Sequence, residues 1–521
     1  MRYVSSAAVR ECDGDAGSAK AKAIGYVALL GVATMVLLLS FAGGYGYQSD
    51  ELYFLDCAAH PAWGYADLPP LLPWLTWIAT NTLGSSLWAI RFYPAVAAGV
   101  ATLLTGYLTA ELGGARRAII AAGVLVFLAP VTLGFGHTLS TNALDMSMWL
   151  LCVILLVRIE NTGQEWLWIA FGAAAGMGLL HKYTLVFLFA ALIVSAVLTS
   201  WRRHFASRWF WAGMALACVI VLPNLVWQAR HDYPFLQLQH FNRVSHHNVV
   251  LPPLQFLAAQ LLLQNPFSAL FTVAGAVFLF TPAMRRFRAL GWTFIVFVLL
   301  MFMLHARDYY LAAVYPPMFA AGAVASERWL PSRWAGRAVS AYLAIAALFT
   351  LLVLPVVLPL FSPERTIAYI QYIPIHRTEP ENLPHTVLPN WVSDQFGWRE
   401  AAETVANYYN ALSAEERAKT AIFGYFYGEA GAVDHFGPAL GLPKAIGSHH
   451  TYWFWGPRNY TGESVIFMDP WPEILKHCTS VTVVGQPENP WARPHDHPNM
   501  YHCRGLDFDL RQEWERFRHF D

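Results

Sequence analysis

Seven ionisable side chains stand where long apolar segments of the sequence end. An adjacent pair of carboxylates follows the first segment, and further acids and cations stand at later joints. These residues are Asp50, Glu51, Asp67, Asp145, Arg91, Lys182 and Arg307. Each of them alone could form a structural ion pair or mark a boundary with water. If they converge at one cavity, carboxylates beside cations would suit acid–base chemistry next to a bound phosphate.

The sequence around the first acids constrains where they lie. Asp50 and Glu51 come a few residues after the first apolar segment, and Asp67 stands just before the pair Pro69–Pro70. Adjacent prolines fix the backbone and end helical geometry, so a stiffened turn is expected at Asp67. The following residues 71–78 are predicted to form a helix that lies on a membrane surface.

The composition indicates a membrane protein. Of the 521 residues, 13% are charged and 56% are hydrophobic, whereas soluble proteins have about 25% and about 45–50%. The apolar excess excludes a disordered chain and a coiled coil, and it argues against an ordinary cytosolic enzyme. The net charge of +0 excludes a basic nucleic-acid binder. Membrane lipids are therefore expected partners, and nucleic acid is not.

Between about residues 21 and 360, apolar segments alternate with short polar joints. A bilayer core of about 30 Å requires about 20 apolar residues per helix, so these segments are predicted to be membrane spans. About eleven are expected, near 22–44, 88–110, 117–135, 143–158, 166–181, 183–200, 209–228, 256–280, 289–304, 309–325 and 338–360. The predicted fold class is therefore mostly α, a polytopic membrane protein with a transmembrane domain over 22–361.

The distribution of Lys and Arg predicts the orientation. If the N-terminal tail, residues 1–21, is cytoplasmic, most basic residues of the short joints lie inside, as the positive-inside rule requires. The other side then holds few basic joint residues, namely Arg91, Lys182, Arg230, Arg243 and Arg307. This orientation places the loop 45–87 and the region after 361 outside the cytoplasm.

Residues 362–521 contain no apolar run of membrane length, so they are expected to form a small α/β domain outside the cytoplasm. A helix is predicted at 398–412, strands at 420–427 and 480–486, and short helices at 429–437 and 470–477. Cys478 and Cys503 could form a disulfide in an oxidising compartment or remain free thiols. The segment 425–429, Tyr-Phe-Tyr-Gly-Glu, could line an acceptor groove or be a structural turn.

Several of these segments occur in the order found in one enzyme family. They are the Asp50-Glu51 pair, Tyr65-Ala-Asp67-Leu-Pro69-Pro70, Arg91-Phe-Tyr-Pro, Thr141-Asn142-Ala-Leu-Asp145, Gly178-Leu-Leu-His181-Lys182-Tyr183 and Arg307-Asp308-Tyr309-Tyr310. In these motifs the chain resembles the membrane glycosyltransferases of the C-type fold. That group includes protein O-mannosyltransferases and the bacterial transferases that add aminoarabinose to lipid A. The likeness is strongest to bacterial family 39-type members and covers roughly residues 22–330.

The resemblance implies an enzyme that takes a sugar from a polyprenyl-phosphate carrier, usually with inversion. The acceptor would be a lipid, a protein or a glycan on the outer face, here of a bacterial plasma membrane. The resemblance assigns Asp50 as the general base and Glu51 as its partner. Arg91 matches a position that holds the carrier phosphate, and Lys182 and Arg307 are expected to share this role. The residues expected to bind substrate are Asp67, Asp145 and Tyr310.

One departure from the family pattern concerns a metal ion. Asp67 matches an acid that helps to hold a metal in the aminoarabinose branch. The next position is a Lys or a His in the family, but this chain has Leu68 there. A divalent metal ion therefore stays open as a cofactor, and the missing phosphate contact must come from elsewhere. The alternative function is a multi-pass transporter or flippase, although the sequence shows no duplicated halves. No P-loop or dinucleotide-binding glycine pattern is present in the sequence.

Overall fold

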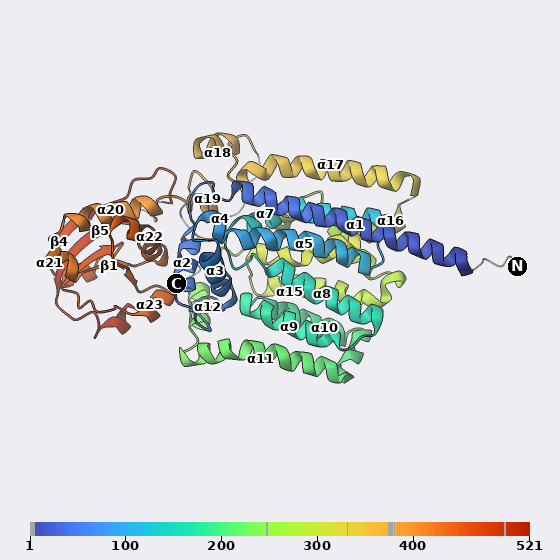
Figure 1. Ribbon diagram of the computed structural model, residues 1–521, viewed down its shortest axis with the longest axis horizontal. Helices are drawn as coiled ribbons and strands as arrows, with labels where there is room; N and C mark the ends of the chain where they lie inside the picture. The colour runs from blue at the N-terminus through green and yellow to red at the C-terminus, as the bar shows by residue number, and fades with distance from the viewer. Residues whose placement is uncertain are drawn as a thin grey trace.

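The protein has two layers, a bundle of long helices and a smaller domain that contains a sheet (Figure 1). The start of helix α1 (Ser6–Phe41) lies at the far end of the bundle, and the last described residues lie between the sheet domain and the bundle. The computed structural model describes residues 6–245, 248–330, 332–373, 379, 381–382, 384, 386–493, 496 and 498–520.

The bundle consists of helices that are apolar over most of their surface. Its main helices are α1 (Ser6–Phe41), α5 (Phe92–Glu111), α6 (Arg116–Phe127), α7 (Pro130–His137), α8 (Asp145–Thr162), α9 (Leu167–His181), α10 (Leu185–Val197), α11 (Arg208–Arg230), α13 (Pro253–Gln264), α14 (Ala269–Leu279), α15 (Arg288–Met303), α16 (Tyr315–Trp329) and α17 (Ser332–Val357). Helices of this kind approach one another through small residues. A Cβ on Gly172 of α9 would lie 2.0 Å from the carbonyl oxygen of Gly213 on α11, so these two backbones are in contact.

Three of the predicted spans are bent pairs of helices. The predicted span 117–135 consists of α6 and α7, which meet at 58°. The span 183–200 consists of α10 and the 3-10 helix η1 (Ser200–Ala206), which meet at 105°. The span 256–280 consists of α13 and α14, which meet at 107°. The first bend lies beside Pro130, which cannot donate a backbone hydrogen bond to continue α6. The third bend, between α13 and α14, lies at Asn265, whose φ of 76° is left-handed.

The predicted count of eleven spans is not confirmed. Within the described residues, five helices are long and apolar enough to cross a membrane, or up to eight if each bent pair counts as one span. The predicted spans 143–158 and 166–181 correspond to α8 and α9, and the shorter of these, α9, has 15 residues. Two of the basic joints contact each other, since Trp201 Nε1 donates to the carbonyl oxygen of Arg286 at 2.8 Å.

Short helices lie between the bundle and the sheet domain (Figure 1). They are α2 (Ser49–Ala59), α3 (Leu71–Thr82), α4 (Leu87–Ile90), α12 (Pro234–Val244), α18 (Pro363–Ile370) and α19 (Asn390–Ser393). The predicted surface helix at 71–78 corresponds to α3, where Trp77 and Ile78 are exposed. The outer joints predicted from the sequence therefore contribute structured elements to the junction between the two layers.

The sheet domain has five strands in the order β2-β1-β3-β5-β4. The strands are β1 (Thr420–Gly424), β2 (Ile446–Gly447), β3 (Ser464–Met468), β4 (Cys478–Gly485) and β5 (Met500–Leu506), and the main helices are α20 (Trp398–Ala411), α21 (Ala414–Lys419), α22 (Tyr427–Phe436) and α23 (Thr451–Trp455). β1 pairs in parallel with β2 and β3, whereas β5 is antiparallel to β3 and β4. The predicted helix at 398–412 and the two predicted strands are present, and β2, β3 and β5 were not predicted.

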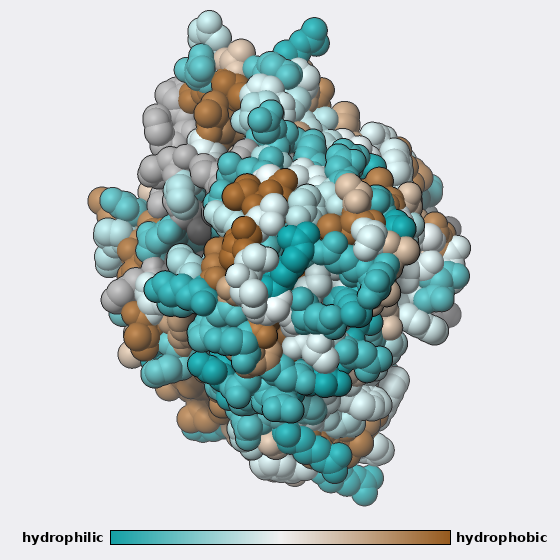
Figure 2. Space-filling view, turned by 90° about the vertical axis from the view of Figure 1, so that its left-hand side faces the viewer, coloured by the Kyte–Doolittle hydropathy of each residue, from teal (hydrophilic) through white to brown (hydrophobic). Residues whose placement is uncertain are grey.

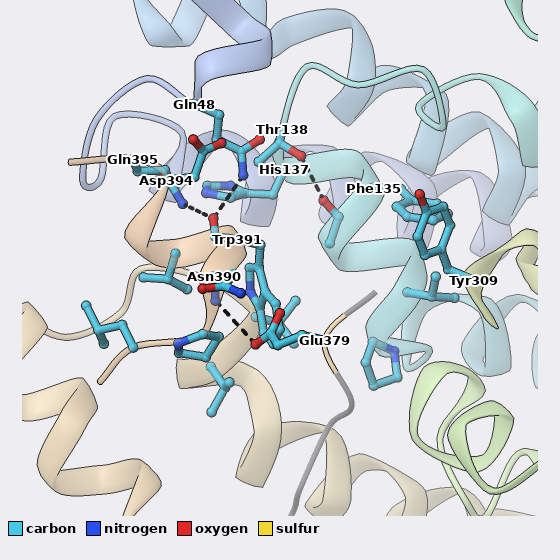
Figure 3. Close-up of a pocket in the computed structure, with 18 of the residues that line it drawn as sticks. Gln48, Phe135, His137, Thr138, Tyr309, Glu379, Asn390, Trp391, Asp394 and Gln395 are labelled. Atoms are coloured by element: carbon cyan, nitrogen blue, oxygen red, sulfur yellow. Dashed lines mark hydrogen bonds between the residues drawn. The ribbon is translucent and has the colours of Figure 1, made fainter. Parts of the chain in front are cut away.

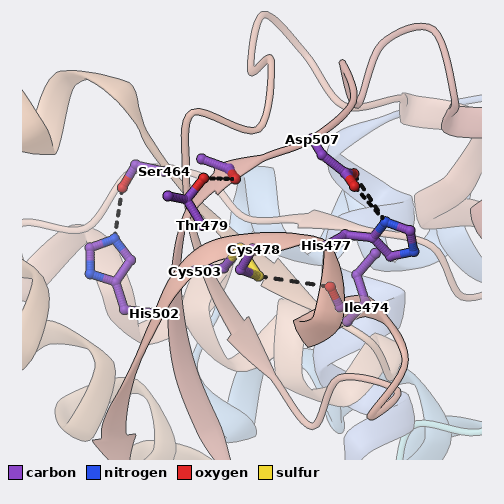
Figure 4. Close-up of a disulfide and its surroundings, with 9 residues drawn as sticks. Ser464, Ile474, His477, Cys478, Thr479, His502, Cys503 and Asp507 are labelled. Carbon is purple, nitrogen blue, oxygen red and sulfur yellow. Dashed lines mark hydrogen bonds and ion pairs between the residues drawn. A yellow bond between two sulfur atoms is a disulfide. The ribbon is translucent and has the colours of Figure 1, made fainter.

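Cys478 and Cys503 form a disulfide between the adjacent strands β4 and β5 (Figure 4). Their Cα atoms are 5.5 Å apart, which is the usual separation for a disulfide. Of the two states left open by the sequence, the structure has the bridged one. The face of the sheet domain that points away from the bundle is largely hydrophilic (Figure 2), as expected for a surface in contact with water.

Candidate active site

A cavity of about 830 Å³ lies where the bundle meets the sheet domain. One end is apolar and is lined by Val131 and Phe135 of α7, Ala259 and Leu262 of α13, and Phe349 and Val353 of α17. The other end is polar and is lined by Gln48, Asp50, Asn142, Asp394, Tyr427 and Arg493. The cavity therefore joins an apolar groove between bundle helices to a polar end beneath the sheet domain.

One wall of the polar end is built from three distant parts of the sequence (Figure 3). The side-chain amides of Gln48 and Gln395 both donate to the carbonyl oxygen of Trp391, at 2.9 and 3.2 Å. His137 and Thr138, at the end of α7, lie beside them in the same view. The bend between α6 and α7 thus directs the end of α7 to the polar wall.

Asp50 lies in the first turn of α2 and is exposed to the cavity. Its Oδ1 accepts a hydrogen bond from the Tyr427 hydroxyl at 2.7 Å. The protein around the cavity shields the Asp50 carboxyl from bulk water, and this desolvation raises its pKa above the ordinary value. The hydrogen bond from Tyr427 acts in the opposite direction, as do the charges of Arg493 and Arg307. A carboxyl with a raised pKa and an open face can accept a proton from a bound hydroxyl.

Glu51 and Arg91 form a buried ion pair that does not reach the cavity. Arg91 Nε and Nη2 donate to the two Glu51 oxygens at 2.8 and 2.7 Å, and both side chains are at most 1% exposed. Arg91 also donates to the carbonyl oxygens of Ala42 and Gly46, at 2.8 Å each. Glu51 in turn accepts the N–H of Leu139 at 3.0 Å. The pair therefore joins the end of α1, the start of α2 and the end of α7.

Asp67 lies next to Asp50 but is held by another tyrosine. Its carboxylate accepts a hydrogen bond from the Tyr53 hydroxyl at 2.6 Å. Burial raises the pKa of Asp67 to about 7, the Tyr53 hydrogen bond opposes the rise, and the charge of Asp50 adds to it. Among the described residues, no three His, Cys, Asp or Glu side chains are placed to hold a metal ion together.

Lys182, Asp145 and Tyr310 form a second polar cluster behind the cavity wall. Lys182 Nζ lies 3.6 Å from Asp145 Oδ2 and 4.6 Å from the centre of the Tyr310 ring. It also donates to Asn142 Oδ1, and Asn142 lines the cavity. Lys182 itself does not line the cavity, and its hydrogen bond to Asn142 connects it to the cavity wall.

Arg307 lies next to this second cluster and contacts three groups. Its Nη1 donates to the Tyr309 hydroxyl at 2.9 Å, its Nε donates to Asn248 Oδ1 at 2.8 Å, and its Nη2 pairs with Glu381 at 2.9 Å. Tyr309 and Glu381 line the cavity. Arg307 therefore supplies positive charge from just behind the wall, on the same side as Lys182.

Sequence reasoning missed the residues that the sheet domain and its linker bring to the cavity. Arg493 donates to Asp496 Oδ2 at 2.5 Å and also to Asp394, which accepts the hydroxyl of Ser49 at 3.2 Å. Arg493 and Asp394 lie in segments without a motif, so the sequence carried no signal for them. Tyr427 lies in the segment 425–429, for which the sequence left two interpretations open, an acceptor groove and a structural turn.

Part of the sequence matches a known protein family. The sequence pattern of the family described as dolichyl-phosphate-mannose-protein mannosyltransferase matches residues 67–227. This segment includes Arg91 and Lys182 but not Asp50 or Arg307. A comparison with curated protein sequences found no match.

The structure is similar to solved structures over most of its length. ArnT from Cupriavidus metallidurans bound to undecaprenyl phosphate superimposes with a TM-score of 0.59 at 14% identity, over 92% of this chain and 98% of that chain. The apo state of the same enzyme gives 0.58 at 13% identity over the same shares. The protein has the C-type glycosyltransferase fold. The oligosaccharyltransferase of Archaeoglobus fulgidus in the apo form has a TM-score of 0.43 at 14% identity, over 79% of this chain and 63% of that chain.

The C-type fold confirms the resemblance found in the sequence motifs. The mostly helical fold predicted from the sequence is also confirmed, since the match to ArnT extends over 92% of this chain. Asp50 lies at the cavity, with the Lys182 and Arg307 clusters just behind its wall, whereas Glu51 and Arg91 lie away from it.

Proposed function

We propose that the protein transfers a sugar from a polyprenyl-phosphate donor to a lipid, protein or glycan acceptor. The observation that carries this proposal is the two-part cavity, in which an apolar groove leads to a polar end that holds Asp50. A polyprenyl phosphate has the same two parts, a long apolar chain and a charged phosphate. The similar ArnT was solved with undecaprenyl phosphate bound. The donor chain would lie along α7, α13 and α17.

In the proposed reaction, Asp50 is the general base. It accepts the proton of an acceptor hydroxyl while the hydroxyl oxygen forms a bond to the anomeric carbon of the sugar. The bond from the anomeric carbon to the phosphate oxygen breaks, and its electron pair leaves with the polyprenyl phosphate. Attack on the face opposite to the leaving group inverts the anomeric centre.

Lys182 and Arg307 are proposed to stabilise the phosphate as it leaves. Charge develops on the leaving oxygen, and fixed cations nearby lower the energy of that state. Asn142 and Tyr309, which contact these two cations, line the cavity and can bind the phosphate oxygens directly. In this proposal Asp145 and Tyr310 hold Lys182 in place, and Asp67 binds the acceptor or the sugar beside Asp50.

Arg91 and Glu51 are proposed to act as a structural brace. Their hydrogen bonds are all directed to each other or to backbone groups, apart from a long contact of 3.5 Å to Gln395. The expected phosphate contact by Arg91 and the expected partnership of Glu51 in base catalysis are therefore not part of the proposed mechanism.

The proposed setting is a bacterial plasma membrane, with the cavity and the sheet domain outside the cytoplasm. The disulfide between Cys478 and Cys503 supports this setting, because disulfides persist in oxidising compartments. The bias of basic residues to the opposite joints supports it independently.

The test is sugar transfer by the purified protein from radiolabelled polyprenyl-phosphate sugars to membrane lipid and peptide acceptors. Asp50→Asn should lower the transfer rate by about 10²–10⁴-fold, because an amide cannot accept the proton, while donor binding is retained. Asp507→Asn is the matched control, since Asp507 pairs with His477 outside the cavity and its replacement should leave transfer unchanged. Full transfer by Asp50→Asn would contradict the general-base role. Movement of the labelled lipid across the membrane without a new glycosidic bond would instead indicate a flippase.

A further inference from the structure

The sheet domain contacts the carboxylate that is proposed as the general base. The Tyr427 hydroxyl, on α22, donates to Asp50 Oδ1 at 2.7 Å, and both residues line the cavity. Within the described part of the chain, this is the one side-chain hydrogen bond recorded for Asp50. The contact joins two residues that are 377 positions apart in the sequence.

The position of Tyr427 is fixed by the fold of the sheet domain. The residue opens α22, directly after Phe426, whose backbone N–H is bonded to the Glu429 carboxylate at 3.0 Å. Its ring packs against Tyr53, with ring centres 4.8 Å apart, and against His449, at 4.9 Å. Tyr427 follows β1 and His449 follows β2, so two neighbouring parallel strands bring both rings to the same edge of the sheet.

The distance between Tyr427 and Asp50 is set by two packed helices. A Cβ on Gly428 of α22 would lie 2.9 Å from Ser49 Cβ, and a Cβ on Gly431 would lie 2.9 Å from Leu52 Cβ. These contacts are closer than ordinary van der Waals distance, so α22 can approach α2 this closely only with glycine at both positions. The hydroxyl is therefore held against the carboxylate by the packing of backbones.

The surroundings decide the protonation of both groups. Burial and the charge of Asp50 raise the pKa of Tyr427 well above its ordinary value, so its hydroxyl remains a hydrogen-bond donor. Desolvation at the cavity also raises the pKa of Asp50, and the hydrogen bond from Tyr427 lowers it. The other charged groups that interact with Asp50 are Glu381, Asp67, Asp394, Arg493 and Arg307.

We propose that Tyr427 is a positioning residue for Asp50, so that the sheet domain completes the active site. This inference rests on the proposed function, because it defines a role relative to the general base. The donated hydrogen bond fixes Oδ1 and leaves Oδ2 free to meet the acceptor hydroxyl. It also favours the ionised carboxylate, which is the form that accepts a proton.

The test compares Tyr427→Phe with the wild-type protein in transfer assays from pH 4 to pH 9. The substitution removes one oxygen and keeps the stacked ring. The acid limb of the profile of kcat/KM should move to higher pH by about one unit, because the ionised carboxylate loses a hydrogen bond. Below the limb the rate should fall about tenfold, and above it the rate should approach the wild-type value with the donor KM unchanged.

Tyr408→Phe is the matched control. The Tyr408 hydroxyl bonds His502 Nδ1 at 3.0 Å within the sheet domain, and Tyr408 does not line the cavity. Its profile should coincide with that of the wild type. An unchanged profile for Tyr427→Phe, or an equal loss at every pH, would overturn the positioning role. If transfer depends on Asp50 while Tyr427→Phe matches the wild type, this inference alone fails. If the wild type transfers no sugar, the proposed function fails with it.

Discussion

Asp50 and Glu51 are neighbours in the sequence, yet the structure gives them different surroundings. Successive residues of a helix point about 100° apart, so α2 turns Asp50 to the cavity and Glu51 to the buried Arg91. The sequence predicted that this pair belongs to the site. It could not indicate which of the two adjacent carboxylates is accessible from the cavity. The partner of each depends on α4, α7 and α22, whose packing is not visible in a local motif.

The buried ion pair leads to a prediction about stability. Arg91→Met leaves the Glu51 carboxylate buried without its partner, which costs about 3–5 kcal/mol in comparable cases. The thermal midpoint of the detergent-solubilised protein should therefore drop strongly. Arg516→Met is the control, because Arg516 and its partner Glu513 are 67% and 39% exposed, and an exposed pair contributes at most about 1 kcal/mol. A stable Arg91→Met protein with a raised donor KM would instead support the phosphate contact expected from the family motif.

At the scale of elements, apolar segments predicted where helices lie but not where they bend. The predicted span 117–135 contains Pro130, yet a proline can kink a span or begin a new helix, and the choice depends on neighbouring helices. The break at Asn265 is stabilised from outside its own segment, since its side chain donates to the Ala346 carbonyl oxygen of α17 at 2.8 Å. Both bends place helix ends at the cavity, so the site depends on features that hydropathy cannot predict.

The packing of α2 on α22 leads to a prediction at the same scale. Gly431→Ala places a Cβ 2.9 Å from Leu52 Cβ and 3.2 Å from the Leu52 carbonyl carbon, so one helix must move. Overpacking of this kind costs about 1–3 kcal/mol, and the movement should separate Tyr427 from Asp50. We expect a lower melting temperature together with a reduced transfer rate. Gly25→Ala in α1 is the matched control, because its Cβ would meet no atom within 4 Å. Wild-type activity in a folded Gly431→Ala protein would show that the close approach of the helices is not needed.

For the whole molecule, the sequence predicted two regions but not how they share a core. Tyr53 and Phe54 of α2 belong to the same buried cluster as Val405 of α20 and Ile422 of β1. The composition changes near residue 362, whereas the packing is continuous across that point. Composition is a local property and can mark the boundary between regions. A contact such as that from Tyr427 to Asp50 joins the two regions and can be found only from the folded chain.

The orientation of the whole molecule is the last prediction, and it decides on which side of the membrane the reaction takes place. The disulfide, the hydrophilic outer face of the sheet domain (Figure 2) and the distribution of basic joints all favour a sheet domain outside the cytoplasm. Val483→Cys on β4 replaces a side chain that is 70% exposed. In spheroplasts, a membrane-impermeant maleimide should label it.

The control for this labelling is Arg202→Cys, in the basic joint η1 at the other end of the bundle. It should react only after the membrane is permeabilised, because positive joints remain in the cytoplasm. Both variants need a background with Cys12→Ser and Cys218→Ser, since Cys218 is exposed, whereas Cys57 and Cys152 are buried. Labelling of Arg202→Cys but not Val483→Cys in intact spheroplasts would place the cavity mouth in the cytoplasm. Transfer on the outer face would then be impossible, whatever the role of Asp50.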